Sequence, residues 1–251
     1  MADVVLSIEG LRKSFGSLVV TDDLALDVMR GELHAVIGPN GAGKTTLIHQ
    51  LSGLTTCDAG RIMFEGADIT HLDMAARAAM GIARSFQITS ILPAFSALEN
   101  VAMAVQARSG TSFRFWQPAA GERALNDAAM AALADVGLDT RSALPAGRLS
   151  HGEKRQLELA IAIATEPKLL LLDEPLAGLG HEESGTSIAL LERLKSRFTI
   201  LLVEHDMDAV FQLADRISVL VYGRLLATGT ADEIRANAAV RSAYLGEEEA
   251  Q

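Results

Sequence analysis

The segment GPNGAGKT fits the spacing G-x-x-x-x-G-K-[ST] of a phosphate-binding loop. Glycines in such a loop let the backbone turn tightly enough for successive N–H groups to point at phosphate oxygens. The lysine supplies a charge for the β- and γ-phosphates, and the last hydroxyl can ligate Mg²⁺. A strand pattern, ELHAVI, precedes the loop and a helical pattern, TTLIHQLSG, follows it, which disfavours an ordinary glycine-rich turn. The predicted ATP-binding residues are Gly38, Pro39, Asn40, Gly41, Ala42, Gly43, Lys44, Thr45 and Thr46, with Thr45 also a metal ligand.

A pair of adjacent carboxylates, Asp173 and Glu174, ends the apolar run of LLLLDEP. The two side chains emerge beside the phosphate-binding loop if the two strands are neighbours. Phosphoryl transfer depends mainly on positioning and charge balance. Asp173 is therefore a candidate Mg²⁺ ligand, or a partner of one of its ligands, and Glu174 a candidate general base for the attacking water. Alone, such a pair is often a solvated strand end; together with the loop it indicates ATP hydrolysis.

A candidate anion site begins the segment LSHGEKRQLELAIAIA. Ser150 and Glu153 have the N-cap and N3 spacing of a capping box, which predicts the start of an amphipathic helix. A helix N-terminus that offers a serine hydroxyl and the free N–H of Gly152 is also suited to an anion. The two interpretations are compatible.

Positioning these groups requires strands that end at one edge of a sheet. Nearly continuous apolar runs at 33–37, 169–173 and 199–203 predict neighbouring central strands that are covered on both faces. VLSIEGL, RIMFEG and RISVLVYGRLLATG alternate more or adjoin turn residues, so they predict antiparallel hairpin strands, and GIARSFQ predicts one more strand. The fold class is therefore α/β, with a mostly parallel sheet and an antiparallel β subdomain.

An alanine-rich region separates the two halves of this sheet pattern. Its helical patterns are SALENVAMAVQAR, which opens with Ser96 and Glu99 at capping-box spacing, ERALNDAAMAALADVG, which stops at Gly137, and SHGEKRQLELAIAIAT. TSFRFWQPAAG is predicted to be a loop between two of them. We expect an α-helical subdomain over residues 88–165 inside a single domain of residues 1–251.

LSHGE, the helix after it and LLLLDEP resemble the signature and Walker B segments of ABC ATPases, and the resemblance covers essentially the whole chain. It implies three more site residues. Phe15 in LRKSFG stands where the family stacks an aromatic ring on adenine, Gln87 in RSFQ would be the Q-loop residue with catalytic and metal-binding roles, and His205 in LLVEHD would be the catalytic switch histidine. The ordinary alternatives are a core aromatic, a polar strand end and a histidine satisfied beside Asp206. The family's order and spacing favour the functional roles of all three.

The same resemblance implies a pair of chains. Ser150, His151 and Gly152 would contact the γ-phosphate of ATP held by a second ATPase subunit, which is either an identical or a similar chain. Two positions depart from the family pattern. His151 replaces the commonest glycine, although Gly152 keeps the position of close approach. Gly180 replaces the usual aspartate or asparagine of the D-loop, so the side-chain contact expected to link the two ATP sites is missing.

A narrower resemblance, to the ATPases of branched-chain or hydrophobic amino acid importers, rests on GPNGAGKTT, GIARSFQ with the later ALENV, the insert near FRFW and the ending VRSAYLGEE. It implies an ATPase with ATP and Mg²⁺ as cofactors that works through integral membrane permease subunits and, indirectly, a periplasmic substrate-binding protein. That subfamily also serves urea, amides and aromatic acids. Lipopolysaccharide-export ATPases share the YLG ending and are the alternative transporter class.

Composition narrows the remaining functions. With 22 basic against 32 acidic residues, the net charge of −10 gives no electrostatic footprint for nucleic acid. A soluble ABC ATPase that acts on DNA or the ribosome, the other alternative, would bring a long coiled coil, two cassettes or a basic surface. A P-loop kinase or GTPase would leave LSHGE and His205 unexplained. The single cysteine, Cys57, and the absence of a signal peptide predict a cytoplasmic protein, peripheral on the inner face of the membrane through its permeases.

Overall fold

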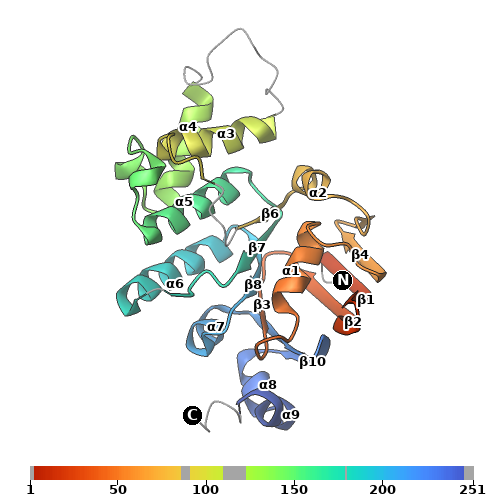
Figure 1. Cartoon of the computed structure of the whole chain (residues 1–251). Helices are drawn as coiled ribbons and strands as arrows, with labels where there is room; N and C mark the ends of the chain where they lie inside the picture. The colour runs from red at the N-terminus through yellow and green to blue at the C-terminus, as the bar shows by residue number, and fades with distance from the viewer. Residues whose placement is uncertain (1–2, 86–90, 110–122, 179, 246–251) are drawn as a thin grey trace.

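The computed structural model describes residues 3–85, 91–109, 123–178 and 180–245, and it contains two sheets flanked by helices (Figure 1). The larger sheet has six strands in the order β10-β9-β3-β8-β7-β6. Its centre consists of β3 (Leu33–Ile37), β8 (Thr199–Val203) and β7 (Leu169–Asp173), which are parallel neighbours. The prediction of three adjacent central strands is confirmed. β8 lies between the strand before the phosphate-binding loop and the strand before the carboxylate pair.

The outer strands make the larger sheet mostly parallel. β6 (Ile82–Arg84) is parallel to β7, and β9 (Arg216–Val221) is parallel to β3. β9 also forms the predicted antiparallel hairpin with β10 (Arg224–Gly229). The carboxyl ends of β6, β7, β8 and β3 therefore meet at one edge of the sheet, which is where ligands bind in parallel α/β sheets.

The smaller sheet is antiparallel, in the order β2-β1-β4-β5. Its strands are β1 (Val4–Phe15), β2 (Leu18–Met29), β4 (Ala59–Phe64) and β5 (Ala67–Asp68). The predicted antiparallel arrangement of VLSIEGL and RIMFEG is confirmed by their pairing, in which Ile8 lies opposite Ile62. The sequence patterns did not predict β2. It carries three aspartates, which strands usually avoid; Asp23 and Asp27 are exposed, whereas Leu24 and Leu26 are buried.

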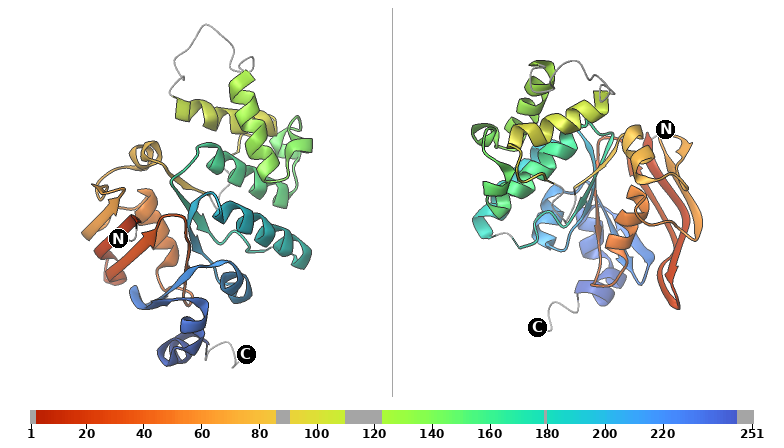
Figure 2. Two further views of the ribbon diagram at one scale, coloured as in Figure 1. Left: turned by 180° about the vertical axis from the view of Figure 1, so that it is seen from behind. Right: turned by 45° about the horizontal axis from the view of Figure 1, so that its top comes forward.

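Alternate residues of the central strands point into two separate cores. Leu169 and Leu171 of β7 join the core that contains α1 (Lys44–Ser52) and the antiparallel sheet. Leu170 and Leu172 join the core that contains α5 (His151–Ala164) and its neighbouring helices. Each such buried leucine contributes about 1.5–3 kcal/mol of transfer free energy. α1 and α5 therefore lie on opposite faces of the larger sheet, as the views of Figures 1 and 2 also show.

The described residues form seven further α-helices. They are α2 (Met74–Met80), α3 (Ala97–Ser109), α4 (Arg123–Asp135), α6 (His181–Lys195), α7 (Met207–Leu213), α8 (Ala231–Ala236) and α9 (Ala238–Val240). α3, α4 and α5 pack against one another at the top of Figure 1. The loop predicted over TSFRFWQPAAG lies outside the described residues.

The predicted helix ends are confirmed. Before α3, the Ser96 N–H donates to the Glu99 carboxylate at 2.7 Å and the Glu99 N–H donates to the Ser96 hydroxyl at 3.2 Å. Ser150 and Glu153 form the same reciprocal pair at the start of α5. Gly137, after α4, has a φ of 77°, a conformation that glycine adopts at little cost. Local sequence therefore determined where these helices begin and end.

Candidate nucleotide-binding site

Two glycines of the phosphate-binding loop are required by its surroundings. A Cβ atom at Gly38 would lie 2.0 Å from the carbonyl oxygen of Leu220, and one at Gly43 would lie 2.5 Å from that of Val20. Gly43 also has a φ of 105°, where other residues are strained. Any larger side chain at either position would therefore push the loop away from β9 or β2. The tight packing of the loop against both sheets explains its shape.

The N-terminus of α1 is left open to an anion. Gly43 is the N-cap and offers no side chain to the first helical N–H groups. The ammonium group of Lys44 is buried and donates to the carbonyl oxygens of Gly38 and Pro39, at 2.6 and 3.1 Å. Burial lowers the pKa of Lys44, while Glu174 and Asp173 oppose that shift. A triphosphate would give this lysine a charged partner in place of two neutral carbonyls.

The carboxylate of Asp173 suits a cation. It lies buried at the end of β7, where burial raises its pKa, and one of its oxygens accepts a hydrogen bond from Arg84 at 3.2 Å. The other oxygen is buried without a hydrogen-bond partner among the described residues. An oxygen in that state is expected beside a metal ion or one of its water ligands. The predicted ligand Thr45 lies in the first turn of α1, on the same edge of the sheet.

Glu174 has an unusual backbone conformation. Its φ is 49°, in the left-handed region that residues other than glycine occupy at a cost of about 1–3 kcal/mol. Its N–H donates to the carbonyl oxygen of Val203, at the end of β8, at 2.8 Å. The turn after β7 is thus held against the neighbouring strand. Strain maintained in this way often occurs at functional sites.

The aromatic and histidine candidates are both exposed. Phe15 ends β1 with 53% of its surface accessible, which excludes the alternative of a core aromatic. His205 follows β8 with 55% of its side chain accessible. Its Nδ1 lies 3.6 Å from the buried Glu204 carboxylate, whereas Asp206 caps α7 instead of pairing with the histidine. Gln87 lies outside the described residues.

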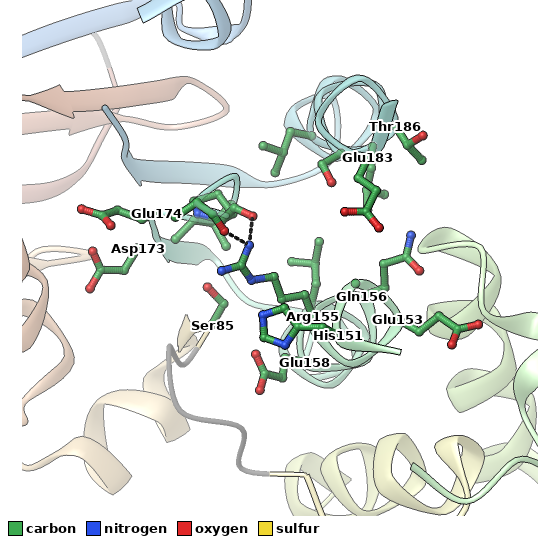
Figure 3. A pocket seen from close by; sticks show the side chains of 18 of the residues that line it. Ser85, His151, Glu153, Arg155, Gln156, Glu158, Asp173, Glu174, Glu183 and Thr186 are labelled. Atoms are coloured by element: carbon green, nitrogen blue, oxygen red, sulfur yellow. Dashed lines mark hydrogen bonds between the residues drawn. The ribbon is translucent and has the colours of Figure 1, made fainter. Parts of the chain in front are cut away.

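Ser150, His151 and Gly152 lie at the beginning of α5 and line a cavity of 590 Å³, together with Asp173 and Glu174. The guanidinium group of Arg155 reaches from α5 to the turn after β7, where it donates to the carbonyl oxygens of Pro175 and Ala177 (Figure 3). In the same figure the two carboxylates extend away from Arg155.

The structure brings together only some of the predicted residues. Burial lowers the pKa of Lys44 and the charges of Glu174 and Asp173 oppose that shift, so the phosphate-binding loop and the carboxylate pair lie close together. The start of α5 approaches Glu174 from the opposite face of the sheet to α1. Gly180 is the N-cap of α6 with nothing within 4 Å of an added Cβ, so the fold does not require glycine there.

Four residues with contacts at the site were not predicted from the sequence. They are Arg84, which binds Asp173; Arg155, which holds the turn after β7; Glu158, which lines the cavity; and Glu204, which precedes His205. Burial raises the pKa of Glu158 to about 7. The sequence contained one kind of signal for these residues, which is a charged residue at the end of an apolar strand or on the apolar side of a helix.

Comparisons with known proteins show the family of this chain. The ABC transporter family matches residues 21–177, and the branched-chain amino acid ATP-binding cassette transporter family matches residues 224–250. The chain belongs to the ABC transporter ATP-binding family. This ATPase is 37% identical to the high-affinity branched-chain amino acid transport ATP-binding protein BraF of Pseudomonas aeruginosa, over 98% of this chain and 100% of the relative. It is 36% identical to LivG of Escherichia coli K12, another high-affinity branched-chain amino acid transport ATP-binding protein, with the same coverage.

Solved structures agree as well. The ADP conformation of MJ1267, an ATP-binding cassette of an ABC transporter, superposes with a TM-score of 0.83 and 29% identity, over 97% of this chain and 99% of that one. The predicted α/β ABC ATPase fold and the predicted class, an ATP-hydrolysing subunit of an ABC transporter, are both confirmed. Within the described ranges, no helix has the length and apolar character needed to span a bilayer.

Proposed function

We propose that this ATPase powers the import of branched-chain or other hydrophobic amino acids, or of related small molecules, through separate permease subunits. The support is the match of residues 224–250 to the branched-chain amino acid cassette family, together with BraF and LivG at nearly full length. The C-terminal match favours this cargo class over lipopolysaccharide export. A periplasmic substrate-binding protein would deliver the cargo, and the ATPase would sit on the cytoplasmic face of the membrane.

Within this function, Lys44 binds the β- and γ-phosphates, Phe15 stacks on adenine, and Thr45 and Asp173 hold Mg²⁺, with Gln87 as a further ligand. Bound there, Mg²⁺ would neutralise charge on the phosphates. Glu174 is the general base and His205 faces the γ-phosphate. The observation that carries this assignment is the shared site of Lys44, Asp173 and Glu174 at one sheet edge.

A complete site requires two chains. The open N-terminus of α1 and the Ser150 end of α5 lie on opposite faces of the sheet, an arrangement that favours a different ATP molecule for each end. We propose that a second ATPase subunit supplies Ser150, His151 and Gly152 to the ATP held by the first. In this arrangement the whole chain, residues 1–251, is one nucleotide-binding domain, and residues 88–165 are its helical subdomain.

The test replaces Glu174 by glutamine. The amide keeps the shape of the side chain but is not a base, so ATP should bind while hydrolysis falls by roughly 100-fold or more. Because unhydrolysed ATP contacts both chains in the closed pair and is bound more tightly there than by one chain, it should stabilise that pair by mass action. Light scattering after size exclusion, with and without Mg-ATP, should show a dimer that depends on ATP.

The control is the double variant Glu174→Gln with Ser150→Arg, which should bind ATP and stay monomeric because the arginine blocks close approach of the chains. Wild-type hydrolysis in Glu174→Gln would remove the glutamate from its role. Loss of hydrolysis without dimerisation would indicate a different ATPase chain as the natural partner.

The cargo class is tested in the assembled transporter. The ATPase, reconstituted with its permeases in vesicles, should hydrolyse ATP faster when a binding protein loaded with leucine is inside the lumen. The same binding protein without amino acid is the control. Equal rates with both, or stimulation by a lipid-linked saccharide instead, would contradict the import of amino acids.

A further inference from the structure

Glu204 is a fully buried acidic residue at the end of an apolar strand. It directly follows the run TILLV of β8, and no part of its surface is accessible. A buried carboxylate is costly unless hydrogen-bond donors surround it. Here the donors are backbone N–H groups of two turns, the one after β7 and the one after β8.

One carboxylate oxygen of Glu204 accepts the N–H of Leu176 at 2.8 Å. Leu176 belongs to the turn after β7 that begins with Glu174. The other oxygen accepts the N–H of His205 at 2.8 Å and that of Asp206 at 3.3 Å. A single side chain therefore binds the backbone of the base-bearing turn and the backbone of the histidine-bearing turn.

The turn that carries Glu174 needs such support. The left-handed backbone of Glu174 persists only where neighbouring groups hold it. The carbonyl of Val203 holds its beginning, through the Glu174 N–H, and Glu204 holds Leu176 further along. Val203 and Glu204 are consecutive residues, so the end of β8 fixes both points.

We propose that Glu204 is a positioning residue for ATP hydrolysis, which holds Glu174 and His205 in fixed relation through the backbone of their two turns. The inference rests on the proposed roles of those two residues. Glu204 itself does not touch ATP, and its effect is transmitted by three N–H groups that both oxygens of one carboxylate accept. The two turns would then move as a unit when the site closes.

The geometry makes Glu204→Gln a sharp test. An amide has one accepting oxygen, so its NH₂ group must face an N–H donor on one of the two sides. One turn should then be displaced. We expect kcat for ATP to fall roughly 10- to 100-fold, as for a misplacement of about 1 Å, while KM for ATP stays within about twofold. The phosphate loop, which binds ATP, has no contact with Glu204 among the hydrogen bonds described.

Glu204→Asp is the second variant, because it keeps the charge and shortens the reach by one methylene. It should show the same split between kcat and KM, and it remains informative if the glutamine variant does not fold. The matched control is Glu32→Gln. Glu32 is also a buried acid that accepts a backbone N–H, from Met29 at 2.7 Å, but it precedes β3 at the edge of the sheet opposite to the site. This control should keep the wild-type kcat.

A double variant with His205→Ala completes the test. Glu204→Asp shortens the reach to both turns at once, so part of its loss passes through His205, and it should lower kcat less in the His205→Ala background than in the wild type. Wild-type kcat in both Glu204 variants, a rise in KM alone, multiplicative losses in the double variant, or an equal loss in Glu32→Gln would each overturn the proposal. If Glu174→Gln hydrolyses normally, the proposed base fails instead, whatever the Glu204 variants do.

Discussion

The N-termini of α1 and α5, the two proposed anion sites, are built in opposite ways. α1 begins after Gly43 with no side-chain cap, so its first N–H groups and Lys44 are available to an ATP molecule bound by that same chain. α5 begins with a complete capping box, in which the Ser150 hydroxyl accepts the Glu153 N–H at 3.2 Å. An uncapped helix end costs stability, and the fold retains one at the proposed phosphate site. The capped end is already satisfied, which suits a surface that meets its ligand only when two chains close.

The largest expected effect comes from removing the lysine at the start of α1, compared with removing a lysine at the start of α5. Lys44→Ala should weaken ATP binding by the single chain roughly 100-fold, or about 3 kcal/mol, because it removes the buried ammonium group from the loop. Lys154→Ala, which removes a lysine from the first turn of α5, should leave ATP binding unchanged. Titration with a fluorescent ATP analogue measures both. Equal affinities for the two variants would show that Lys44 is not the charge that binds ATP.

The next effect concerns Gly152, where the fold does not need glycine. The nearest group to an added Cβ is a Glu183 oxygen at 3.7 Å, an ordinary contact. Gly152→Ala should therefore be as stable as wild type or more so, by up to about 1 kcal/mol, from helix propensity. Hydrolysis should still fall roughly tenfold, because the methyl group prevents close approach of the partner's phosphate. Gly185→Ala, in the exposed part of α6, is the control that should gain stability and keep hydrolysis.

Ser150 allows capping to be separated from binding in trans. Ser150→Ala should lower the free energy of unfolding by about 1 kcal/mol, because the Glu153 N–H loses its acceptor. Ser150→Asp should restore the cap and the stability but repel phosphate, so hydrolysis should be lower than in Ser150→Ala. Urea denaturation measures the free energy of unfolding, and a steady-state assay measures the rate of ATP hydrolysis. If hydrolysis follows stability in both variants, Ser150 is only a cap.

The smallest effect is a pH dependence on the α5 side. The pKa of Glu158 is raised to about 7 by burial, so its charged form destabilises the fold as pH rises from about 4.5 through 7. Glu158→Gln removes this charge. The variant should exceed wild type in unfolding free energy by about 1 kcal/mol at about pH 8, a value discounted for partial exposure, and match it near about pH 5. A constant difference across this range would mean that the charge is not the cause.

Much of the fold was predictable because its signals are local. The three central strands are continuous apolar runs, and Ser96, Glu99, Ser150 and Glu153 mark helix starts by their spacing. β2 was missed because a strand in an antiparallel sheet is stabilised by its partner, which outweighs the poor strand preference of Asp22 and Asp23. From the sequence, the proximity of Asp173 to the loop was conditional on neighbouring strands, but β8 lies between β3 and β7, so these two strands are not direct neighbours.

The family, the phosphate-binding loop and the class of chemistry could be predicted from the chain alone, because a motif of glycines, a lysine and a hydroxyl acts through residues adjacent in the chain. Which charged groups surround the site depends on the tertiary fold. Arg84 meets Asp173, Arg155 meets the turn after β7, and Glu204 joins that turn to His205. These contacts join residues on different strands and helices, so they exist only once the order of the strands and the faces of the sheet are set. No local pattern encodes them, because a buried charge is tolerated wherever folding happens to bring its donors or acceptors together.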